Sequence, residues 1–332
     1  MYDPPFLDHL RAWLRVALPR WGLPAGAGLS LLNVSENATF LAEAPGRRLV
    51  LRVYRPGYHD AAEMRSELAW IAALREGAVV ETPRPVPALQ GGLLQAIPDG
   101  ATRRHVVAFE HMAGTEPPGA GLMPWFRRLG AITARLHAHG RGWVPPPGFT
   151  RKRWDFSTML GERPHWGSWR DAIGLDAAGA AILADVAASL RGRLAAYGEA
   201  PHRYGLIHAD LRLANLLAEG ERLGVIDFDD CGFCWYLYDF AAAVSFIEDD
   251  PILPALAAAW VAGYRGVAPL AEADLAMLPA FVMLRRLLLT AWLASHAETP
   301  TARALGAGYT SGTVALGRAF LRGDPGIPIA CR

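Results

Sequence analysis

Hydrophobic and polar positions in the first hundred residues follow a pattern that predicts a small antiparallel sheet. Short hydrophobic runs are separated by polar turn residues at 35–37 and by Pro45-Gly46, as in strands joined by tight turns. After the third run, Met64, Leu68 and Ile71 have the spacing of one helical face. We therefore predict strands at 29–34, 38–42, 49–54, 93–97 and 105–109, with a helix at 61–76.

The rest of the chain changes to a helical period. An amphipathic segment also precedes the first strand and ends at Pro19, whereas residues 141–170 are rich in Pro, Gly and Trp and predict an irregular insertion. The fold class we expect is α+β with two lobes, an N-terminal lobe at 1–109, a hinge at 110–114 and a helical C-terminal lobe at 115–332. In that second lobe we predict helices at 122–139, 177–197, 236–247, 253–264, 271–296 and 301–322.

Polar residues of the second lobe have a spacing that predicts phosphoryl transfer. The stretch 206–217, LIHADLRLANLL, places His208, Asp210 and Asn215 in the order H-x-D-x-x-x-x-N, and Asp227 follows a short hydrophobic run. The runs on either side of the turn 219–221 predict a hairpin that brings Asn215 and Asp227 to the same end of two strands. Phosphoryl transfer needs a carboxylate for the proton of the attacking hydroxyl and oxygen ligands for Mg²⁺. We assign Asp210 as the base and Asn215 and Asp227 as the metal ligands.

In order and spacing these residues resemble the catalytic loop and metal-binding aspartate of the aminoglycoside phosphotransferase and choline kinase branch of the protein-kinase-like fold. Type II homoserine kinases and stress-response kinases are among the relatives. The resemblance implies a bilobal protein-kinase-like fold, ATP or GTP together with Mg²⁺ as cofactors, and a hydroxyl as phosphate acceptor. It also implies that Asp239 braces the catalytic loop by accepting backbone hydrogen bonds. We interpret His208 as a structural residue that holds the loop by packing and hydrogen bonding.

The same resemblance implies a nucleotide-binding set in the first lobe. Arg52 stands on a strand where protein kinases have lysine, and Glu67 is the matching helical acid. The turn with Ser35 and Asn37 is similar to the phosphate-covering loop of the family, although it lacks the glycine-rich pattern. The backbones of Glu110 and Met112, in the connector between the lobes, are expected at the adenine edge.

Several arginines and histidines near this motif allow two interpretations. Arg212 either contacts the transferred phosphate or is a solvated surface residue. Arg285-Arg286 either binds a substrate carboxylate, as an amino-acid kinase would require, or forms a salt-bridged helix face. His137, in the sequence His-x-His, ends a predicted helix and has no acidic residue close by in the sequence, so we interpret it as a C-terminal helix feature.

The acceptor is expected to be a small molecule, such as an amino acid or an amino alcohol. Only eleven residues separate Asp227 from Asp239, too few for the long activation segment that docks peptides in protein kinases. A stress-response type Ser/Thr protein kinase, an aminoglycoside phosphotransferase with Glu248-Asp-Asp250 as its acidic run, and a nucleotide-binding pseudokinase remain alternatives. An aromatic cluster beside the motif is expected to pack the insertion against the core; it comprises Trp154, Trp166, Trp169, Trp235, Tyr236 and Tyr238.

Composition excludes several other classes of protein. The formal net charge is +1, so no strong field indicates nucleic acid or a membrane surface as a partner. The three cysteines do not make a disulfide framework, which fits a cytoplasmic protein. A zinc site on Cys231 and Cys234 would need a second cysteine pair or suitably spaced histidines, which the sequence does not offer, so both are expected to be buried fillers. The apolar stretch 278–294 contains Arg285 and Arg286, which favours a buried helix over a membrane span. A monomer or a homodimer is expected.

Overall fold

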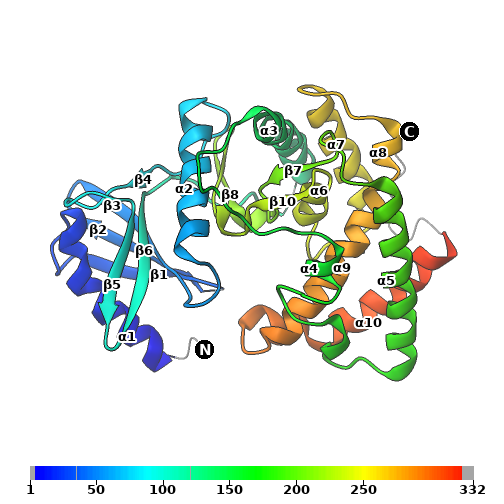
Figure 1. Cartoon of the computed structure of the whole chain (residues 1–332), viewed down its shortest axis with the longest axis horizontal. Coiled ribbons are helices and arrows are strands. Elements are labelled where there is room, and N and C mark those ends of the chain that lie inside the picture. Colours follow the sequence, from blue (N-terminus) through cyan, green and yellow to red (C-terminus); the bar gives the residue numbers. More distant parts are fainter. Residues whose placement is uncertain (1–3, 35, 120, 324–332) are drawn as a thin grey trace. The chain divides into compact units, whose positions relative to one another are not determined.

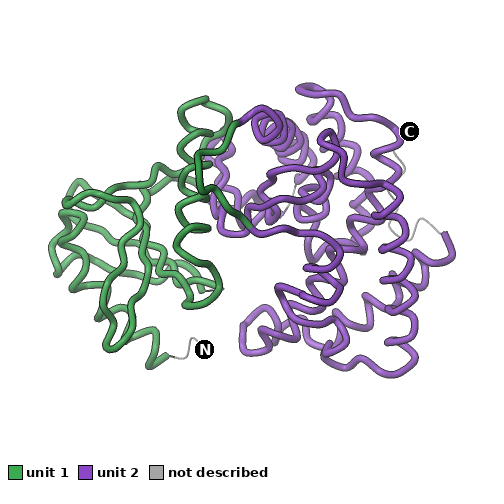
Figure 2. Tube along the Cα trace, in the orientation of Figure 1, with its two compact units in different colours: residues 1–114, 144–151 green, residues 115–143, 152–332 purple. Residues whose placement is uncertain are grey.

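A computed structural model describes residues 4–34, 36–119 and 121–323 of the chain. Two compact units make up the chain (Figure 2): unit 1 comprises Met1–Gly114 and Val144–Arg151, and unit 2 comprises Thr115–Trp143 and Lys152–Arg332. The predicted hinge ends where the first part of unit 1 ends. Residues 144–151, which the prediction placed in the second lobe, group with unit 1.

Unit 1 is built on a six-stranded antiparallel sheet (Figure 1) in the order β1-β2-β3-β6-β4, with β5 also paired to β6. All the predicted strands are present, and residues 85–86, predicted as part of an extended linker, add a two-residue edge strand. In the central ladder Leu51 pairs with Phe40 on one side and with Ala108 on the other. The strands are β1 (Gly28–Val34), β2 (Ala38–Ala44), β3 (Arg47–Val53), β4 (Pro85–Val86), β5 (Leu94–Asp99) and β6 (Thr102–Glu110).

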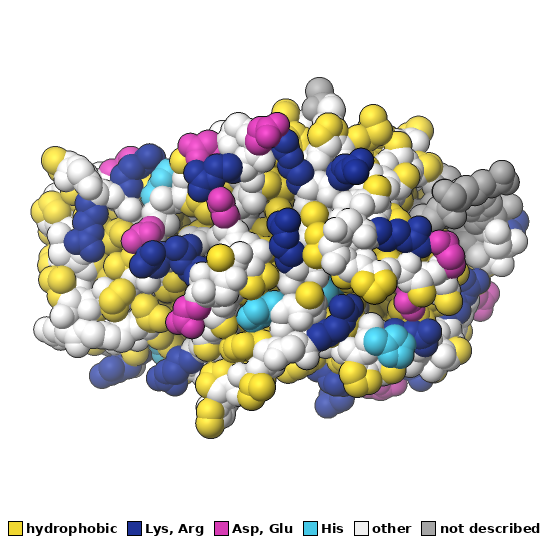
Figure 3. Space-filling model, turned by 90° about the horizontal axis from the view of Figure 1, so that it is seen from above, with side chains coloured by type: hydrophobic (Ala, Val, Ile, Leu, Met, Phe, Trp, Pro, Cys, Tyr) yellow, Lys and Arg dark blue, Asp and Glu magenta, His cyan; other side chains and the backbone are white. Residues whose placement is uncertain are grey.

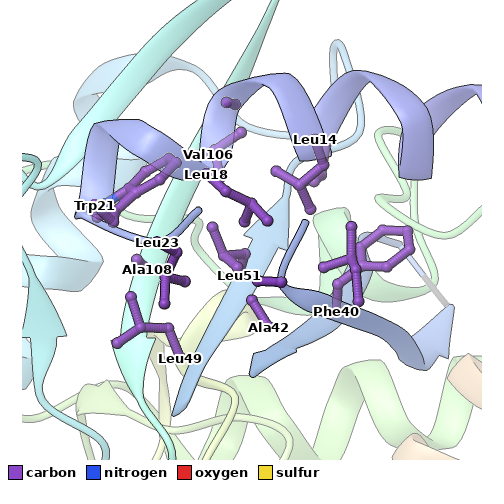
Figure 4. Close-up of a cluster of buried hydrophobic side chains, with 14 of the residues drawn as sticks. Leu14, Leu18, Trp21, Leu23, Phe40, Ala42, Leu49, Leu51, Val106 and Ala108 are labelled. Carbon is purple, nitrogen blue, oxygen red and sulfur yellow. The ribbon is translucent and has the colours of Figure 1, made fainter. Parts of the chain in front are cut away.

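One hydrophobic cluster joins this sheet to the amphipathic N-terminal segment, which forms the helix α1 (Pro4–Ala17) and the 3₁₀ turn η1 (Leu18–Trp21). Leu14, Leu18 and Trp21 pack on side chains of the strands, among them Phe40 and Leu51 (Figure 4), and all five are fully buried. Burial of each such side chain contributes about 1.5–3 kcal/mol. The cluster therefore fixes the sheet that carries Arg52.

The second helix of unit 1, α2 (Ala61–Glu76), has the predicted bounds. Asp60 caps its start, because the Asp60 carboxylate accepts hydrogen bonds from the backbone N–H groups of Ala62 and Glu63. Residues of the segment 144–151 bind to this helix: the Thr150 N–H donates to Ser66 Oγ at 2.9 Å, and Arg151 Nη1 donates to the Glu63 carbonyl at 2.9 Å. These bonds explain why the segment groups with unit 1.

Unit 2 is mostly helical, as predicted, so the fold class is α+β. The predicted helix at 271–296 is divided in two, because Pro279 lies in the first turn of the second piece and cannot continue a helix that precedes it. The predicted helix at 236–247 is shorter, and the irregular insertion contains only α4 (Phe156–Met159) and the 3₁₀ turn η2 (Trp169–Asp171). The other helices of unit 2 are α3 (Leu122–Gly142), α5 (Ala177–Tyr197), α6 (Tyr238–Ala243), α7 (Leu253–Arg265), α8 (Glu272–Leu275), α9 (Leu278–Ser295) and α10 (Pro300–Arg322).

Two short two-stranded ladders interrupt these helices and carry the predicted motif. One pairs β7 (Tyr204–Ile207) with β10 (Gly232–Trp235), and the other pairs β8 (Leu216–Glu219) with β9 (Arg222–Val225); both are antiparallel. The second ladder is the hairpin that the sequence predicts. The chain between the two ladders contains the residues 208–215 and the 3₁₀ turns η3 (Leu213–Asn215) and η4 (Phe228–Asp230).

Among the described residues, one helical segment is long and apolar enough to cross a membrane by length and composition, Glu272–Ser295. Its most apolar window is 78% buried, which is the property of a core helix. On the face of the molecule in Figure 3, basic and acidic side chains alternate with hydrophobic ones and do not gather into one patch. This agrees with the balanced charge of the sequence.

Candidate active site

Two buried polar side chains, His208 and Asp239, hold the loop after β7 by hydrogen bonds. His208 Nε2 donates to the carbonyl oxygen of Ile226 at 3.1 Å, and its Nδ1 accepts the N–H of Asp210 at 3.3 Å. The N–H of Ala209 donates to Asp239 Oδ1 at 2.8 Å. Ala209 itself has a φ of 66°, in the left-handed region that non-glycine residues seldom adopt. The structural role of His208 and the bracing role of Asp239 are confirmed.

His137 lies behind Asp239 and is not the helix-end feature that we predicted. Its Nε2 lies 3.0 Å from Asp239 Oδ2, and its Nδ1 lies 3.1 Å from the hydroxyl oxygen of Tyr264 on α7. Burial lowers the pKa of His137, and the neighbouring Asp239 only partly opposes this shift. The neutral ring therefore donates from Nε2 to Asp239 and accepts at Nδ1 from Tyr264. The acidic partner is 102 residues away in the sequence, so a local search could not find it.

Three side chains fix the carboxylate of Asp210. Asn215 Nδ2 donates to Oδ2 at 2.7 Å, Arg212 Nε donates to Oδ2 at 3.1 Å, and Arg285 Nη2 donates to Oδ1 at 2.5 Å. Burial opposes ionisation of this group, but the charges of Arg212 and Arg285 outweigh it and lower the pKa of Asp210 below its ordinary value. The carboxylate is therefore ionised at neutral pH and held in one orientation.

The hairpin brings the two predicted metal ligands to one end of paired strands. Leu216 pairs with Val225, and the ladder continues as the N–H of Ile226 donates to the carbonyl of Asn215 at 2.9 Å. Asp227 follows directly, with φ 62° and ψ 67°. Non-glycine residues in this left-handed backbone conformation occur often at functional sites.

The chemistry of these two side chains fits a hard divalent cation. Asn215 Nδ2 is committed to the carbonyl and the carboxylate of Asp210, so the amide oxygen of Asn215 points to the other side. One amide oxygen and the carboxylate of Asp227 are oxygen donors of the kind that Mg²⁺ prefers when phosphates and water complete its shell. Within the described ranges no group of three His, Cys, Asp or Glu side chains could hold a metal by itself. The assignment of Asn215 and Asp227 as ligands stays a prediction.

Arg285 and Arg286 are both ion-paired within the chain, as the salt-bridged interpretation expected. Arg285 pairs with Asp210, and Arg286 Nη1 pairs with Glu248 at 2.7 Å. Both arginines are buried. Arg285 is thus a residue of the site that the motif did not reveal. The only signal in the sequence was an arginine in the middle of an apolar helix, where an unpaired charge would be too costly.

In unit 1 the predicted pair of Arg52 and Glu67 is present. Arg52 Nη1 lies 2.6 Å from Glu67 Oε1, and the hydroxyl of Tyr54 donates to Glu67 Oε2 at 3.0 Å. Arg52 also lies over the ring of Phe109, with 5.4 Å between its Cζ and the ring centroid. The arginine is therefore held by a buried acid on α2, as the resemblance implies. Contact with a nucleotide stays a prediction.

The other residues predicted to bind nucleotide differ in their environments. Asn37 Oδ1 accepts the N–H of Arg55 at 3.0 Å, so this oxygen stabilises the turn. Ser35 lies outside the described residues. The N–H of Glu110 donates to the carbonyl of Arg84 at 2.8 Å, which leaves the Glu110 carbonyl rather than its N–H for an adenine edge. Met112 lies just beyond β6, in the predicted connector.

Side chains around the motif are packed as expected. Cys231 and Cys234 are both buried, and burial raises the pKa of the Cys234 thiol, which suits an inert filler rather than a reactive group. Every member of the predicted aromatic cluster is buried, so its role in packing is confirmed: Trp154, Trp166, Trp169, Trp235, Tyr236 and Tyr238.

Comparison with known proteins adds a family and several relatives. The sequence model described as "Phosphotransferase enzyme family" matches residues 30–273. The chain is similar to the solved structure of a microcompartment-associated aminopropanol kinase, with a TM-score of 0.88 and 47% identity, over 94% of this chain and 97% of that one. It is similar in fold to an amicoumacin kinase in complex with AMP-PNP, Ca²⁺ and Ami, with a TM-score of 0.76 and 22% identity, over 95% and 94% of the two chains. A homoserine kinase of Gluconobacter oxydans is 27% identical over 256 residues, 74% of each chain.

Proposed function

Because this chain belongs to the phosphotransferase enzyme family, we propose that it transfers the γ-phosphate of ATP to the hydroxyl of an amino alcohol in a Mg²⁺-dependent reaction. The family and the enzyme class predicted from the sequence, a small-molecule phosphotransferase, are confirmed. Aminopropanol is the first acceptor to test, since the aminopropanol kinase resembles this chain over nearly its whole length.

The observation that carries the proposal is the environment of the Asp210 carboxylate. A negative group that accepts hydrogen bonds from Asn215, Arg212 and Arg285 is rigid and ionised, as the residue that receives a proton at neutral pH must be. Its low pKa makes it a weak base. A weak base suits phosphoryl transfer, because the loose transition state forms little bond to the attacking oxygen before the proton is lost.

The proposed reaction assigns a role to each of these groups. The acceptor oxygen bonds to the γ-phosphorus, the bond between that phosphorus and the β,γ-bridging oxygen breaks, and ADP leaves. The hydroxyl proton passes to Asp210. Arg212 is 30% exposed at its side chain, so it is free to exchange its bond to Asp210 for one to the transferred phosphate, as the sequence interpretation allowed.

Asn215 and Asp227 would hold the metal ion, and Arg52, paired with Glu67, would bind nucleotide phosphate in unit 1. Bound Mg²⁺ supplies positive charge against the nucleotide phosphates. The complex of the related amicoumacin kinase with AMP-PNP and Ca²⁺ supports a nucleotide and a divalent cation for this family member too.

Two features favour an amino alcohol over an amino acid or a protein as acceptor. Arg285 and Arg286, the arginines that an amino-acid acceptor would have needed for its carboxylate, are committed to Asp210 and Glu248. The eleven residues between Asp227 and Asp239 are taken up by η4, by β10 in its pairing with β7, and by the start of α6. That segment provides no platform for a peptide.

The test is a coupled assay of ADP release with purified protein, ATP and Mg²⁺, followed by mass spectrometry of the product. Aminopropanol is compared with homoserine, which has an amine and a hydroxyl but adds a carboxylate. We expect kcat/KM for aminopropanol to exceed that for homoserine at least about tenfold, since the buried arginines Arg285 and Arg286 are already paired with carboxylates of the chain. A preference for homoserine would contradict the amino-alcohol assignment. Labelled phosphate on proteins, with no small alcohol turned over, would favour the protein-kinase alternative.

A further inference from the structure

Arg285 is the most tightly held charged side chain next to the predicted base. It lies in the middle of α9, and its side chain is 2% exposed. Each of the three guanidinium nitrogens donates a hydrogen bond to a different residue. Nε donates to Ser245 Oγ at 3.0 Å, Nη1 to the Tyr238 hydroxyl at 3.1 Å, and Nη2 to Asp210 Oδ1 at 2.5 Å. The partners come from the catalytic loop, from α6 and from the turn after α6. The guanidinium is therefore fixed independently of Asp210.

The hydrogen bonds of Asp210 differ between its two oxygens. Oδ2 accepts from both Asn215 and Arg212, and a carboxylate oxygen has two lone pairs in its plane. Among the residues that the structure describes, Arg285 is the single donor to Oδ1, so one lone pair of Oδ1 remains. This is the position from which Asp210 would accept the proton of the acceptor hydroxyl.

We propose that Arg285 is a positioning residue of the reaction, which holds Oδ1 of Asp210 so that its remaining lone pair faces the acceptor hydroxyl. Arg285 itself contacts neither acceptor nor nucleotide. The inference rests on the proposed function of Asp210 as proton acceptor. Arg212 cannot replace Arg285 in this role, because Arg212 binds the other oxygen and is partly exposed.

Loss of this contact would lower turnover more than it lowers binding. Displacement of a catalytic group by about 1 Å can cost about 100-fold in rate. Lysine at position 285 keeps the charge but is a point donor without the planar fork that spans Asp210, Tyr238 and Ser245. The KM values for nucleotide and acceptor should change little, because Arg285 touches neither.

Arg286 provides a matched control within the same helix. It is also an arginine, it is buried to a similar degree, and its guanidinium is also ion-paired, but its partners are Glu248, Thr313 and Tyr309. None of these belongs to the catalytic loop. A general effect of replacing a buried, paired arginine in α9 should appear in both variants, whereas an effect on Asp210 should appear only at position 285.

The experiment compares Arg285→Lys and Arg286→Lys in the ADP-release assay, with the Tm of each protein measured alongside. We expect Arg285→Lys to lower kcat by about 10- to 100-fold, with each KM within about threefold of wild type. Arg286→Lys should keep kcat within about threefold, although its Tm falls at least as far. Equal losses of kcat in both variants, or a wild-type kcat in Arg285→Lys, would overturn the proposal.

A double-mutant cycle separates positioning from a purely structural role. If Arg285 acts through Asp210, then Arg285→Lys should have little further effect in an Asp210→Asn background. The same fold-loss in that background would overturn the proposal. Arg285→Ala adds a second readout, since millimolar guanidinium should restore part of its turnover. If the wild type uses another alcohol, only the proposed acceptor fails, and the variants are compared with that alcohol.

Discussion

Replacement of Gly263 by alanine should destabilise unit 2, because α7 crosses α3 with no room for a methyl group. A Cβ built on Gly263 lies 1.8 Å from the carbonyl oxygen of Arg127 and 3.1 Å from the amide nitrogen of Ala131. Gly130 makes the reciprocal contact, since its Cβ would lie 2.0 Å from the carbonyl oxygen of Trp260. Both obstacles are helix backbone, which cannot rotate away. The two helices must separate to admit the new atom.

The size of the effect follows from that geometry. Ordinary van der Waals contact begins at 3.4 Å, so the new methyl group needs a large shift of one helix. Overpacking of a close-packed interior costs about 1–3 kcal/mol, and rigid obstacles favour the upper end. For a unit of this size, a loss of about 3 kcal/mol lowers Tm by about 6–12 °C. The same shift moves His137 on α3 against Tyr264 on α7, so kcat should fall as well.

The assay is thermal unfolding of purified protein, followed by far-ultraviolet circular dichroism, with Gly192→Ala as the matched control. Gly192 lies in α5, and a Cβ built on it meets nothing within 4 Å beyond its chain neighbours and the adjacent backbone of its own helix. Alanine is favoured over glycine in a helix by about 1 kcal/mol, so Tm should rise by about 2–4 °C. An unchanged Tm in Gly263→Ala, or a shift of the same sign in both variants, would refute the reasoning about the α3–α7 crossing.

Three further results are expected. Asp210→Asn keeps the shape of the side chain and removes the base, so kcat should fall about 10²- to 10⁴-fold while nucleotide still raises the Tm; wild-type turnover would reject Asp210. A chelator should abolish transfer and added Mg²⁺ should restore it, if Asn215 and Asp227 hold the ion; transfer in excess chelator would argue against that site. Because burial lowers the pKa of His137, the unfolded chain takes up a proton at this residue below pH of about 6.5, and the folded protein takes it up only at a lower pH. The free energy of unfolding should then fall with decreasing pH by up to about 1.4 kcal/mol per pH unit from this group, with no contribution at higher pH. Urea unfolding of His137→Gln at several pH values should show a smaller slope, and an identical slope would contradict the role of the buried neutral ring.

Local signals in the sequence were sufficient for much of the fold. The bounds of α2 and α5 match the predicted 61–76 and 177–197, because each helix begins at an aspartate cap and keeps one apolar face. The hairpin of β8 and β9 was also predictable, since a polar turn separates two short apolar runs. The helices that were predicted with wrong bounds are those where tertiary packing or a proline overrides the period, as at Pro279.

The contacts that complete the site could not be predicted in the same way. Asp210 and Asn215 are five residues apart and belong to one motif, but Arg285 reaches Asp210 across 75 residues. The bond between His137 and Asp239 spans 102 residues. Neither pair has a fixed spacing, and each depends on how α9 or α3 packs in unit 2. For Arg285 the sequence offered only an indirect signal, namely that a charged residue in an apolar helix needs an ion-pair or hydrogen-bond partner.

The division of the chain into units has a practical consequence for dissection. The backbone changes unit at three junctions, after Gly114, after Trp143 and after Arg151. A fragment that stops at Gly114 would lose the segment 144–151, in which Thr150 and Arg151 are hydrogen-bonded to α2. No single cut yields both halves intact, so the N-terminal half should be produced for separate study only with residues 144–151 grafted back through a designed linker.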